Sequence, residues 1–319
     1  MKSYLTKYLV KLPLDTQVCL LSSLSVLLLG LGLHRADHYP FDWLTITHLL
    51  LCVLIFTAAY IAGHFAEYPR ACSLSRTFCF STFIALCTVI TLHVLPLSPF
   101  PMRDSALARA DQLLGFNTGR FSMAIRNHHP DIKFFFDVAY AALIPISYFS
   151  LLTLSWFSAH RARELILLMS LSSFFGLFLY FFLPAIGPMA SYHYTMSNAE
   201  LALLKNINLV RKDGPASQLF LTGDISFPSF HTILAIFCAW VWRDYKIIFI
   251  PLCLISFLII LSTLTTGWHY LSDVLGGILI SFVSIYSAKL IFKSKTKNNT
   301  QNNKSFELAD LIPSAPQVG

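Results

Sequence analysis

Two histidines and an aspartate in the C-terminal half of the sequence have the types and spacing needed for phosphate chemistry. His231 ends the stretch FPSFH, and His269 precedes Asp273 by four residues in WHYLSD. A carboxylate one helical turn from an imidazole fixes its tautomer and leaves the other ring nitrogen free to act as a nucleophile. Ionisable residues at the edge of apolar helices are costly and therefore indicate a functional site. These residues predict a site for phosphate transfer.

The pattern predicts a separate role for each of these side chains. We expect His269 to attack a lipid phosphate and form phosphohistidine, with Asp273 stabilising the charge that develops on its ring. His231 would protonate the leaving oxygen and then act as base for water or an alcohol. Pro228 is favoured in the first turn of a helix, and the N–H groups there favour a bound anion. Ser229 would add a hydroxyl donor to that anion, or would serve only as the helix cap.

A bound phosphate requires positively charged side chains, and the loop 96–133 offers arginines for this role. Arg120 and Arg126 are the candidate phosphate ligands because arginine binds phosphate in a bidentate manner; a solvated or headgroup-facing position is the alternative for each. Trp268 and Tyr270 are interpreted as aromatic residues at the membrane interface. The seven cysteines have no metal-ligand spacing, so we predict no metal, no disulfide and no cofactor.

The elements that must position these residues are apolar helices. The sequence is 55% hydrophobic and only 12% charged over 319 residues, far from the composition of a soluble domain. Segments long enough to cross the hydrocarbon core predict an all-α polytopic membrane protein of about eight transmembrane helices in one domain. They lie near 17–34, 46–63, 77–95, 134–157, 164–184, 228–243, 246–265 and 269–292.

Two longer loops and a tail complete the predicted organisation. Apolar residues recur with a helical period from Ser105 to Leu114, before Gly115, and predict a surface helix in the loop 96–133. Ser197 and Glu200 form a capping-box pattern that predicts a second surface helix in the loop 185–227. The tail 293–319 is polar and without periodicity, and we expect it to be disordered.

The distribution of basic residues predicts the orientation in the membrane. With alternating helices, one side receives both termini and the loops 64–76, 158–163 and 243–246, which together hold more than half of the 23 Lys and Arg residues. The positive-inside rule makes that side cytoplasmic. We therefore expect both termini in the cytoplasm and the site outside, on the periplasmic face of a bacterial inner membrane. The basic residues form no stripe that would bind nucleic acid.

The motif residues resemble the type 2 phosphatidic acid phosphatase superfamily. PSFH at 228–231 is similar to its motif PSGH, with phenylalanine where glycine is usual. Ser262, His269 and Asp273 match its motif SRxxxxxHxxxD, with Thr263 in place of arginine. The family's first motif, KxxxxxxRP, is absent, since the chain has no Arg-Pro pair. Because these two departures remove positively charged residues of the family motifs, we expect the side chains that bind the phosphate charge to lie outside the motifs.

The segments FPSFH and WHYLSD, and YFFLPAIGP before them, resemble the branch that includes inositol phosphorylceramide synthase, the aureobasidin-resistance protein. The similarity covers about 180–277. It implies a metal-independent histidine phosphatase or phosphotransferase with a six-helix core. On this basis the chain divides into two N-terminal transmembrane helices at 1–75, the lipid phosphatase/phosphotransferase-like core at 76–292, and the tail at 293–319.

Three functions agree with these features. The first is an integral membrane enzyme that transfers a phospho-headgroup from a membrane lipid through phosphohistidine, to water or to a polyol such as inositol. The second is a plain phosphatase of phosphatidate or polyprenyl diphosphate. The third is a lipid-binding or transport protein that kept the fold without the reaction. The residues leave open the lipid, the acceptor and the oligomeric state.

Overall fold

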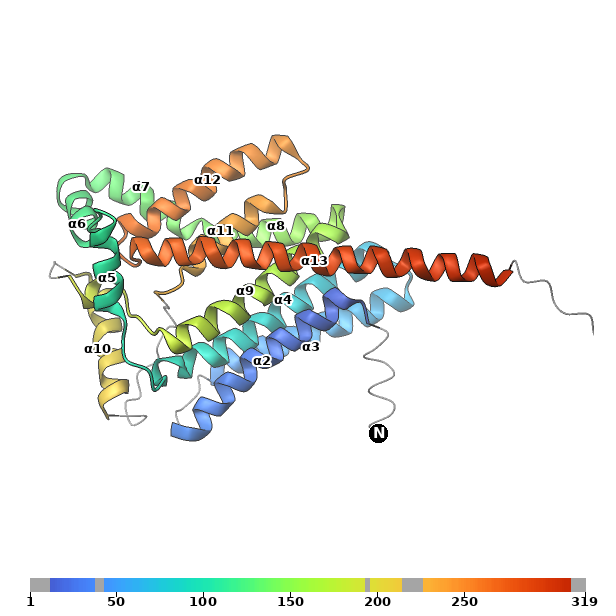
Figure 1. Ribbon diagram of the computed structural model, residues 1–319, viewed down its shortest axis with the longest axis horizontal. Coiled ribbons are helices and arrows are strands. Elements are labelled where there is room, and N and C mark those ends of the chain that lie inside the picture. Colours follow the sequence, from blue (N-terminus) through green and yellow to red (C-terminus); the bar gives the residue numbers. More distant parts are fainter. Residues whose placement is uncertain (1–11, 38–42, 193–195, 214–225, 311–319) are drawn as a thin grey trace, which may run out of the picture.

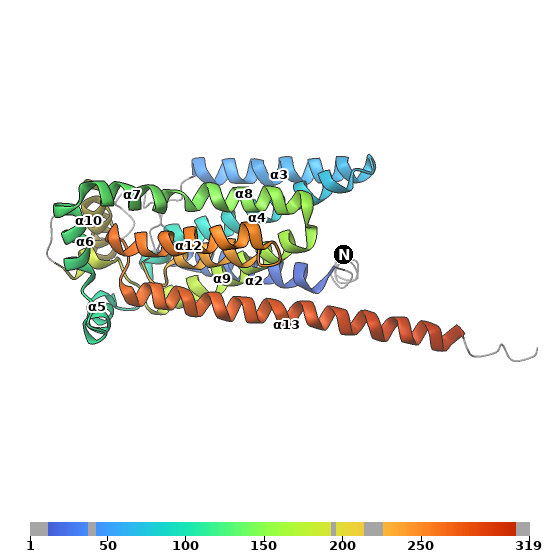
Figure 2. The ribbon, with the colours of Figure 1, turned by 90° about the horizontal axis from the view of Figure 1, so that it is seen from above.

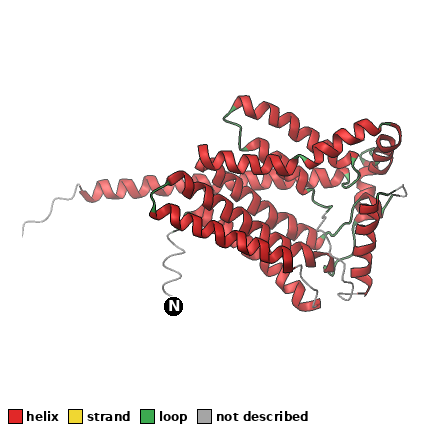
Figure 3. Ribbon diagram, turned by 180° about the vertical axis from the view of Figure 1, so that it is seen from behind, coloured by secondary structure: helices red, strands yellow, loops and turns green. Residues whose placement is uncertain are grey.

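The computed structural model describes residues 12–37, 43–192, 196–213 and 226–310. These residues form helices and turns, with no strand among them (Figure 3). In chain order the elements are α2 (Leu14–Asp37), α3 (Trp43–Phe65), α4 (Pro69–Val94), η1 (Leu95–Leu97), α5 (Asp104–Leu113), α6 (Thr118–His128), α7 (Pro130–Ala141), α8 (Leu143–Phe157), α9 (Ala159–Phe182), η2 (Pro188–Ala190), α10 (Asn198–Asp213), α11 (Phe230–Trp240), α12 (Lys246–Thr265) and α13 (Leu271–Asp310).

The prediction of an all-helical polytopic membrane protein is confirmed. In the described part of the chain, 7 segments are long and apolar enough to cross a membrane. They are Leu14–His34, Leu44–Phe65, Pro69–Leu97, Pro130–Phe157, Ala159–Phe182, Lys246–Thr265 and Leu271–Lys293. The eighth apolar segment, expected at 228–243, forms α11, which has only 11 residues. It begins after its cap at Ser229, and a polar turn containing Arg243 and Asp244 follows it, so it is shorter than the bilayer core is thick.

The long helices run side by side along the longest dimension of the molecule (Figure 1). Helices α5, α6 and α10 gather at one end of this bundle, and the view from above places them at the same end (Figure 2). Helix α13 also begins at that end, and its last turns project beyond the bundle at the other (Figures 1 and 2). The turn before α13, which carries His269, therefore lies at the same end of the bundle as the three short helices.

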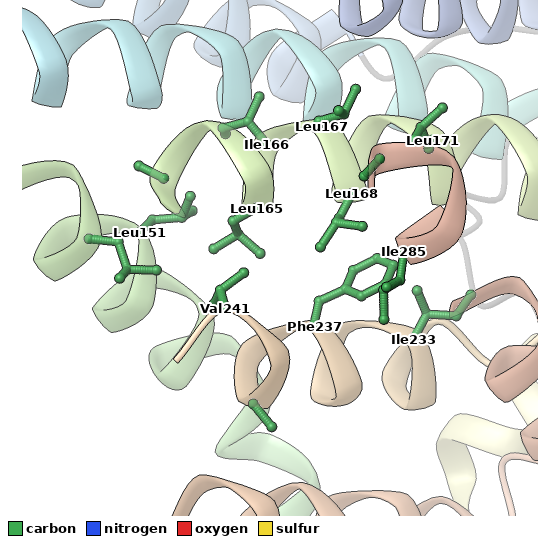
Figure 4. Close-up of a cluster of buried hydrophobic side chains, with 14 of the residues drawn as sticks. Leu151, Leu165, Ile166, Leu167, Leu168, Leu171, Ile233, Phe237, Val241 and Ile285 are labelled. Atoms are coloured by element: carbon green, nitrogen blue, oxygen red, sulfur yellow. The ribbon is translucent and has the colours of Figure 1, made fainter. Parts of the chain in front are cut away.

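Helix α9 forms the centre of the bundle. Of the most hydrophobic window in its membrane segment, 61% is buried, as expected for a helix that is apolar on all sides. Leu165 and Leu168 of α9 pack with Ile233 and Phe237 of α11 and Ile285 of α13 in one cluster (Figure 4). This packing joins α11 and α13, the two helices beside the predicted catalytic residues, to the centre of the protein.

The predicted surface helices correspond to α5 and α10. Helix α5 is followed by Gly115, which has φ of +74°, a value that suits glycine. The capping box before α10 is formed: the Ser197 N–H donates to Glu200 Oε2 at 2.7 Å, and the Glu200 N–H donates to Ser197 Oγ at 3.3 Å. Helix α13 continues to Asp310, residues 311–319 lie outside the described part of the chain, and the disorder of the tail stays a prediction. No Pro or Gly interrupts residues 293–310, so no residue there breaks the helix.

Candidate active site

The start of α11 is held directly against the start of α13. Ser229 is the N-cap of α11, and its buried hydroxyl accepts a hydrogen bond from the Thr232 N–H at 3.3 Å. The Ser229 N–H donates to the backbone carbonyl of Asp273 at 3.0 Å. A Cβ at Gly277 would lie 2.7 Å from the Ser229 carbonyl, so only glycine permits this approach. The FPSFH and WHYLSD segments are therefore joined through backbone atoms.

His269 lies in the turn before α13, whereas the spacing predicts His269 and Asp273 on one face of a helix. The reason is that α13 begins at Leu271. Asp273 still approaches the imidazole, with Oδ2 at 3.5 Å from Nδ1. A closer partner of Nδ1 is the carbonyl oxygen of Ser226, at 2.9 Å. Because a carbonyl can only accept, Nδ1 must carry the proton, and the lone pair of the neutral ring is therefore on Nε2.

Asp273 is fully buried and fixes the turn that carries His269. Its Oδ2 accepts hydrogen bonds from Ser226 Oγ at 2.5 Å and from the Tyr270 N–H at 2.7 Å. The second bond closes the first turn of α13 in the manner of a capping box. The carboxylate thus holds the backbone N–H that follows His269 and the side chain of Ser226, besides placing a negative charge close to the His269 ring.

His231 and His269 line the same cavity. The two ring centroids are 5.9 Å apart with an interplanar angle of 57°. The His231 ring stacks on Tyr140 of α7, at 3.9 Å between centroids and 21° between planes. The cavity has a volume of about 240 Å³, and both histidines line it. Its other lining residues are mostly apolar and comprise Thr88, Leu92, Tyr140, Leu177, Ile186, Ser226, Phe230 and Trp268.

The structure brings together His231, His269 and Asp273 and places the predicted phosphate ligands differently. Ser229 is buried as the cap of α11, in the second of the two roles considered for it. The side chain of Arg120 is exposed on α6. Arg126 binds Glu200 and the Thr266 carbonyl beside the His269 turn. None of the three lines the cavity, and direct phosphate binding by them stays a prediction.

Asp111 is a buried residue of α5 that caps the start of α13. Its two carboxylate oxygens accept hydrogen bonds from the N–H groups of Leu271 and Ser272, each at 2.8 Å, and Oδ2 also accepts from Thr118 Oγ1 at 3.0 Å. A carboxylate at this position satisfies the unpaired donors of the first turn and is favoured by the helix dipole. Helix α5 thus fixes where α13 begins.

Asp104, at the first position of α5, binds the proline-rich segment after α9. Its Oδ1 accepts hydrogen bonds from the N–H groups of Ile186 at 3.0 Å and Gly187 at 2.8 Å. Burial raises the pKa of the Asp104 carboxyl from 3.8 to about 6, although these two hydrogen bonds act in the opposite direction. Tyr270 Oη donates to the Gly187 carbonyl at 2.8 Å. This segment is thereby tied both to α5 and to the His269 turn.

The two aromatic residues that flank His269 differ from their predicted positions at the membrane interface. Tyr270 has no exposed surface and hydrogen-bonds inside the protein, so the interpretation as an interfacial residue is wrong. Its hydroxyl finds buried polar partners in the segment after α9, which the sequence does not reveal. Trp268 lines the cavity beside the histidines. Tyr140, likewise absent from the sequence motifs, contributes the ring stacked on His231.

Comparison with known protein families shows the family to which the sequence belongs. The sequence profile of the PAP2 superfamily matches residues 105–287, more than half of the 319 residues. The chain belongs to the PAP2 superfamily. The matched range runs from α5 to the middle of α13 and includes both histidines, Asp273, Asp111 and the cavity-lining Tyr140. No curated protein and no solved structure matches the chain significantly.

PAP2 proteins are generally phosphatases, and this chain is a PAP2 membrane protein consistent with a lipid phosphatase. In the range matched by the PAP2 profile, Thr263 stands where the motif has arginine. The Thr263 hydroxyl donates to the carbonyl of Ile260 at 2.7 Å within α12. Its backbone carbonyl accepts from the His269 N–H at 3.3 Å. In this PAP2 chain the position therefore contributes to the His269 turn through its backbone.

Proposed function

We propose that this protein is an integral membrane phosphatase or phosphotransferase that acts on lipid phosphate esters through a phosphohistidine on His269. The observation that carries the proposal is the hydrogen bond from His269 Nδ1 to the Ser226 carbonyl at 2.9 Å, which puts the lone pair on Nε2. The second histidine, His231, lines the same cavity with its ring centred 5.9 Å away. A nucleophile and a proton carrier that line one cavity are what double displacement requires.

The reaction follows from these positions. Nε2 of His269 forms a bond to phosphorus while the ester P–O bond breaks, and protonated His231 gives its proton to the leaving oxygen. In the second half, water or an alcohol transfers a proton to His231 and attacks phosphorus, and the P–N bond breaks. The Ser226 carbonyl and Asp273 stabilise the positive charge on the His269 ring. No step requires a metal or a cofactor.

The site is proposed to face the periplasm of a bacterial inner membrane, with both termini in the cytoplasm. Arg161 and Arg163 lie at the start of α9 and Arg243 follows α11, at the end of the bundle opposite α5, α6 and α10 (Figure 1). The positive-inside rule assigns that opposite end to the cytoplasm. The accessibility of single cysteines introduced on α5 and at the α8–α9 turn to a membrane-impermeant reagent in intact cells tests this orientation; labelling at the α8–α9 turn would reverse it.

Hydrolysis and transfer share the phosphoenzyme and differ in the acceptor. The similarity of FPSFH and WHYLSD to the synthase branch supports transfer of a phospho-headgroup to a polyol such as inositol. Plain hydrolysis of phosphatidate or polyprenyl diphosphate uses the same residues with water as acceptor. The products therefore decide between the two reactions, while the histidine variants test the chemistry that both have in common.

The test uses purified protein in lipid nanodiscs and a panel of labelled lipids containing phosphate monoesters, diphosphates and phosphodiesters, with and without inositol and a chelator. We expect chelator-resistant turnover that is lost in His269→Ala. His231→Ala should slow turnover about 10² to 10⁴-fold and should accumulate acid-labile phosphoprotein when the substrate has a good leaving group. The matched control is His128→Ala, at an exposed histidine of α6. An absence of both turnover and phosphoprotein across the panel would favour a non-enzymatic lipid-binding protein.

A further inference from the structure

Arg126 and Glu200 form a buried ion pair next to the turn that carries His269. The Arg126 guanidinium donates to both Glu200 carboxylate oxygens, at 2.9 Å and 2.7 Å, and Nη2 also donates to the Thr266 carbonyl at 2.5 Å. The side chain of Arg126 is 12% exposed and that of Glu200 is 0% exposed. Such a bidentate pair is much more constrained than a surface ion pair. It joins three elements that are far apart in the sequence.

Glu200 is held in place on its own helix as well. Its carboxylate closes the capping box at the start of α10 by accepting from the Ser197 N–H at 2.7 Å. Burial acts to raise the pKa of Glu200, but the hydrogen bonds from Arg126 and Ser197 outweigh it, and the pKa is lowered. The carboxylate is therefore ionised at neutral pH, and Arg126 has a fixed negative partner on a fixed helix.

The third partner, the Thr266 carbonyl, lies at the C-terminal end of α12, where a positive charge is favoured by the helix dipole. The next residue, Gly267, has φ of +80°, and a Cβ there would lie 2.9 Å from Arg126 Nη2. Two residues later, the His269 N–H returns to the Thr263 carbonyl at 3.3 Å. The guanidinium thus packs against the backbone of the short turn that determines the position of the His269 ring.

We propose that Arg126 and Glu200 are positioning residues that hold the turn before α13, and with it His269, at the distance from His231 that the reaction requires. This role rests on the proposed function and differs from direct phosphate binding, the role that the sequence predicts for Arg126. The contacts favour positioning because the guanidinium is directed to Glu200 and the Thr266 carbonyl, while other residues line the cavity.

The two roles predict different kinetics. Loss of a positioning contact lowers kcat with little change in KM, since a displacement of about 1 Å can cost about 10²-fold in rate. Loss of a phosphate ligand weakens substrate binding, and KM rises. Glu200→Gln separates them further: positioning predicts a lower kcat, whereas a phosphate-binding Arg126 released from its carboxylate would bind substrate more tightly.

The experiment compares Arg126→Lys, Glu200→Gln and the double variant with wild type in nanodiscs. Lysine keeps the positive charge but cannot make the three contacts of the guanidinium. We expect kcat to fall about 10- to 100-fold in each single variant with KM within about twofold, and the double variant to resemble the single ones because one unit is lost in all three. Lys133→Asp combined with Asp137→Lys, a reversal of a partly exposed ion pair on α7, is the matched control.

A second measurement is independent of turnover. Diethyl pyrocarbonate modifies accessible imidazole, and the rate at which His269 is modified is followed by mass spectrometry of its peptide. We expect this rate to rise at least about tenfold in Arg126→Lys and Glu200→Gln and to remain unchanged in the control pair. This outcome supports positioning even if wild type turns over no lipid in the panel, a result that would contradict only the proposed function.

Two results would overturn the inference. The first is an increased KM with unchanged kcat in Arg126→Lys together with a decreased KM in Glu200→Gln, which assigns Arg126 to phosphate binding. The second is wild-type kcat and wild-type His269 modification in both variants, which reduces the pair to a contact between α6 and α10. Monodisperse elution and wild-type helicity of Glu200→Gln, which keeps the size and shape of the side chain, exclude misfolding as the cause of a lowered kcat.

Discussion

Replacing Asp104 with asparagine should make the protein more stable at neutral pH. Asp104 is buried, and its pKa is raised from 3.8 to about 6, so the folded state disfavours the ionised carboxylate. The stabilisation linked to its proton is complete below pH 3.8 and is lost as the pH rises through about 6. A difference of about two pH units corresponds to about 3 kcal/mol. Asparagine avoids this cost and can still accept from both Ile186 and Gly187 through Oδ1.

The expected gain in the free energy of unfolding at pH 7 is smaller than the about 3 kcal/mol that corresponds to the pKa shift of Asp104. Asp104 Oδ2 also lies 3.2 Å from the Ile186 nitrogen, and an amide NH₂ there loses that weak bond, a cost of about 0.5–1.5 kcal/mol. We therefore expect Asp104→Asn to be more stable than wild type by about 2 kcal/mol at pH 7, and equal or less stable at pH 4.

Unfolding in mixed micelles of increasing SDS fraction, followed by tryptophan fluorescence at pH 4 and pH 7, measures this difference. The control is Asp131→Asn, at an exposed aspartate of α7, which should show no such crossover. A difference between wild type and Asp104→Asn that is the same at both pH values would refute the reasoning, because the burial of the charge would then have no cost.

Three further changes test how the site is assembled. Asp111→Ala leaves two N–H donors of α13 without their acceptor and should lower the free energy of unfolding by about 2–6 kcal/mol, measured by the same SDS titration; a loss below about 1 kcal/mol would contradict the capping role. Gly277→Ala forces a Cβ toward the Ser229 carbonyl and pushes the starts of α11 and α13 apart. It should lower kcat at least about tenfold with wild-type expression; an unchanged kcat would show that the close approach of these two helices is not needed. Tyr140→Leu removes the ring stacked on His231, a contact of about 0.5–1.5 kcal/mol, and should alter the pH profile of kcat, whereas Tyr140→Phe should not; identical profiles for the two variants would contradict the stacking role.

His231, His269 and Asp273 could be singled out from the sequence because the motifs that contain them are local. FPSFH and WHYLSD are short, and each follows or precedes an apolar run, so their residue types and spacing are readable from the sequence alone. What the spacing could not predict is that α13 begins at Leu271. The start depends on Asp111, which lies 160 residues earlier, and on the return of the Asp273 carboxylate to the Tyr270 N–H.

The roles of the residues that hold the site in place could not be predicted from the sequence, for a related reason. Asp104 and Asp111 resemble ordinary polar residues of an amphipathic surface helix, yet both are buried. Their partners are mainly backbone N–H groups of distant segments, and backbone groups carry no sequence signal. Glu200 is readable as a helix cap, but its second partner, Arg126, is on another helix. A periodic pattern identifies such helices without revealing what their buried side chains bind.

Backbone contacts, more than apolar packing, explain how the two histidines reach one cavity. Packing between apolar helices in a membrane gains little from excluding lipid, and small residues let helices approach closely. Gly277 brings the α13 backbone against the Ser229 carbonyl, and the bond from the Ser229 N–H to the Asp273 carbonyl fixes one register between α11 and α13. His231 and His269 lie within a few residues of these contacts. The distance between His231 and His269 is therefore set by main-chain geometry. A substitution in the apolar core would alter this distance far less than a single methyl group added at Gly277.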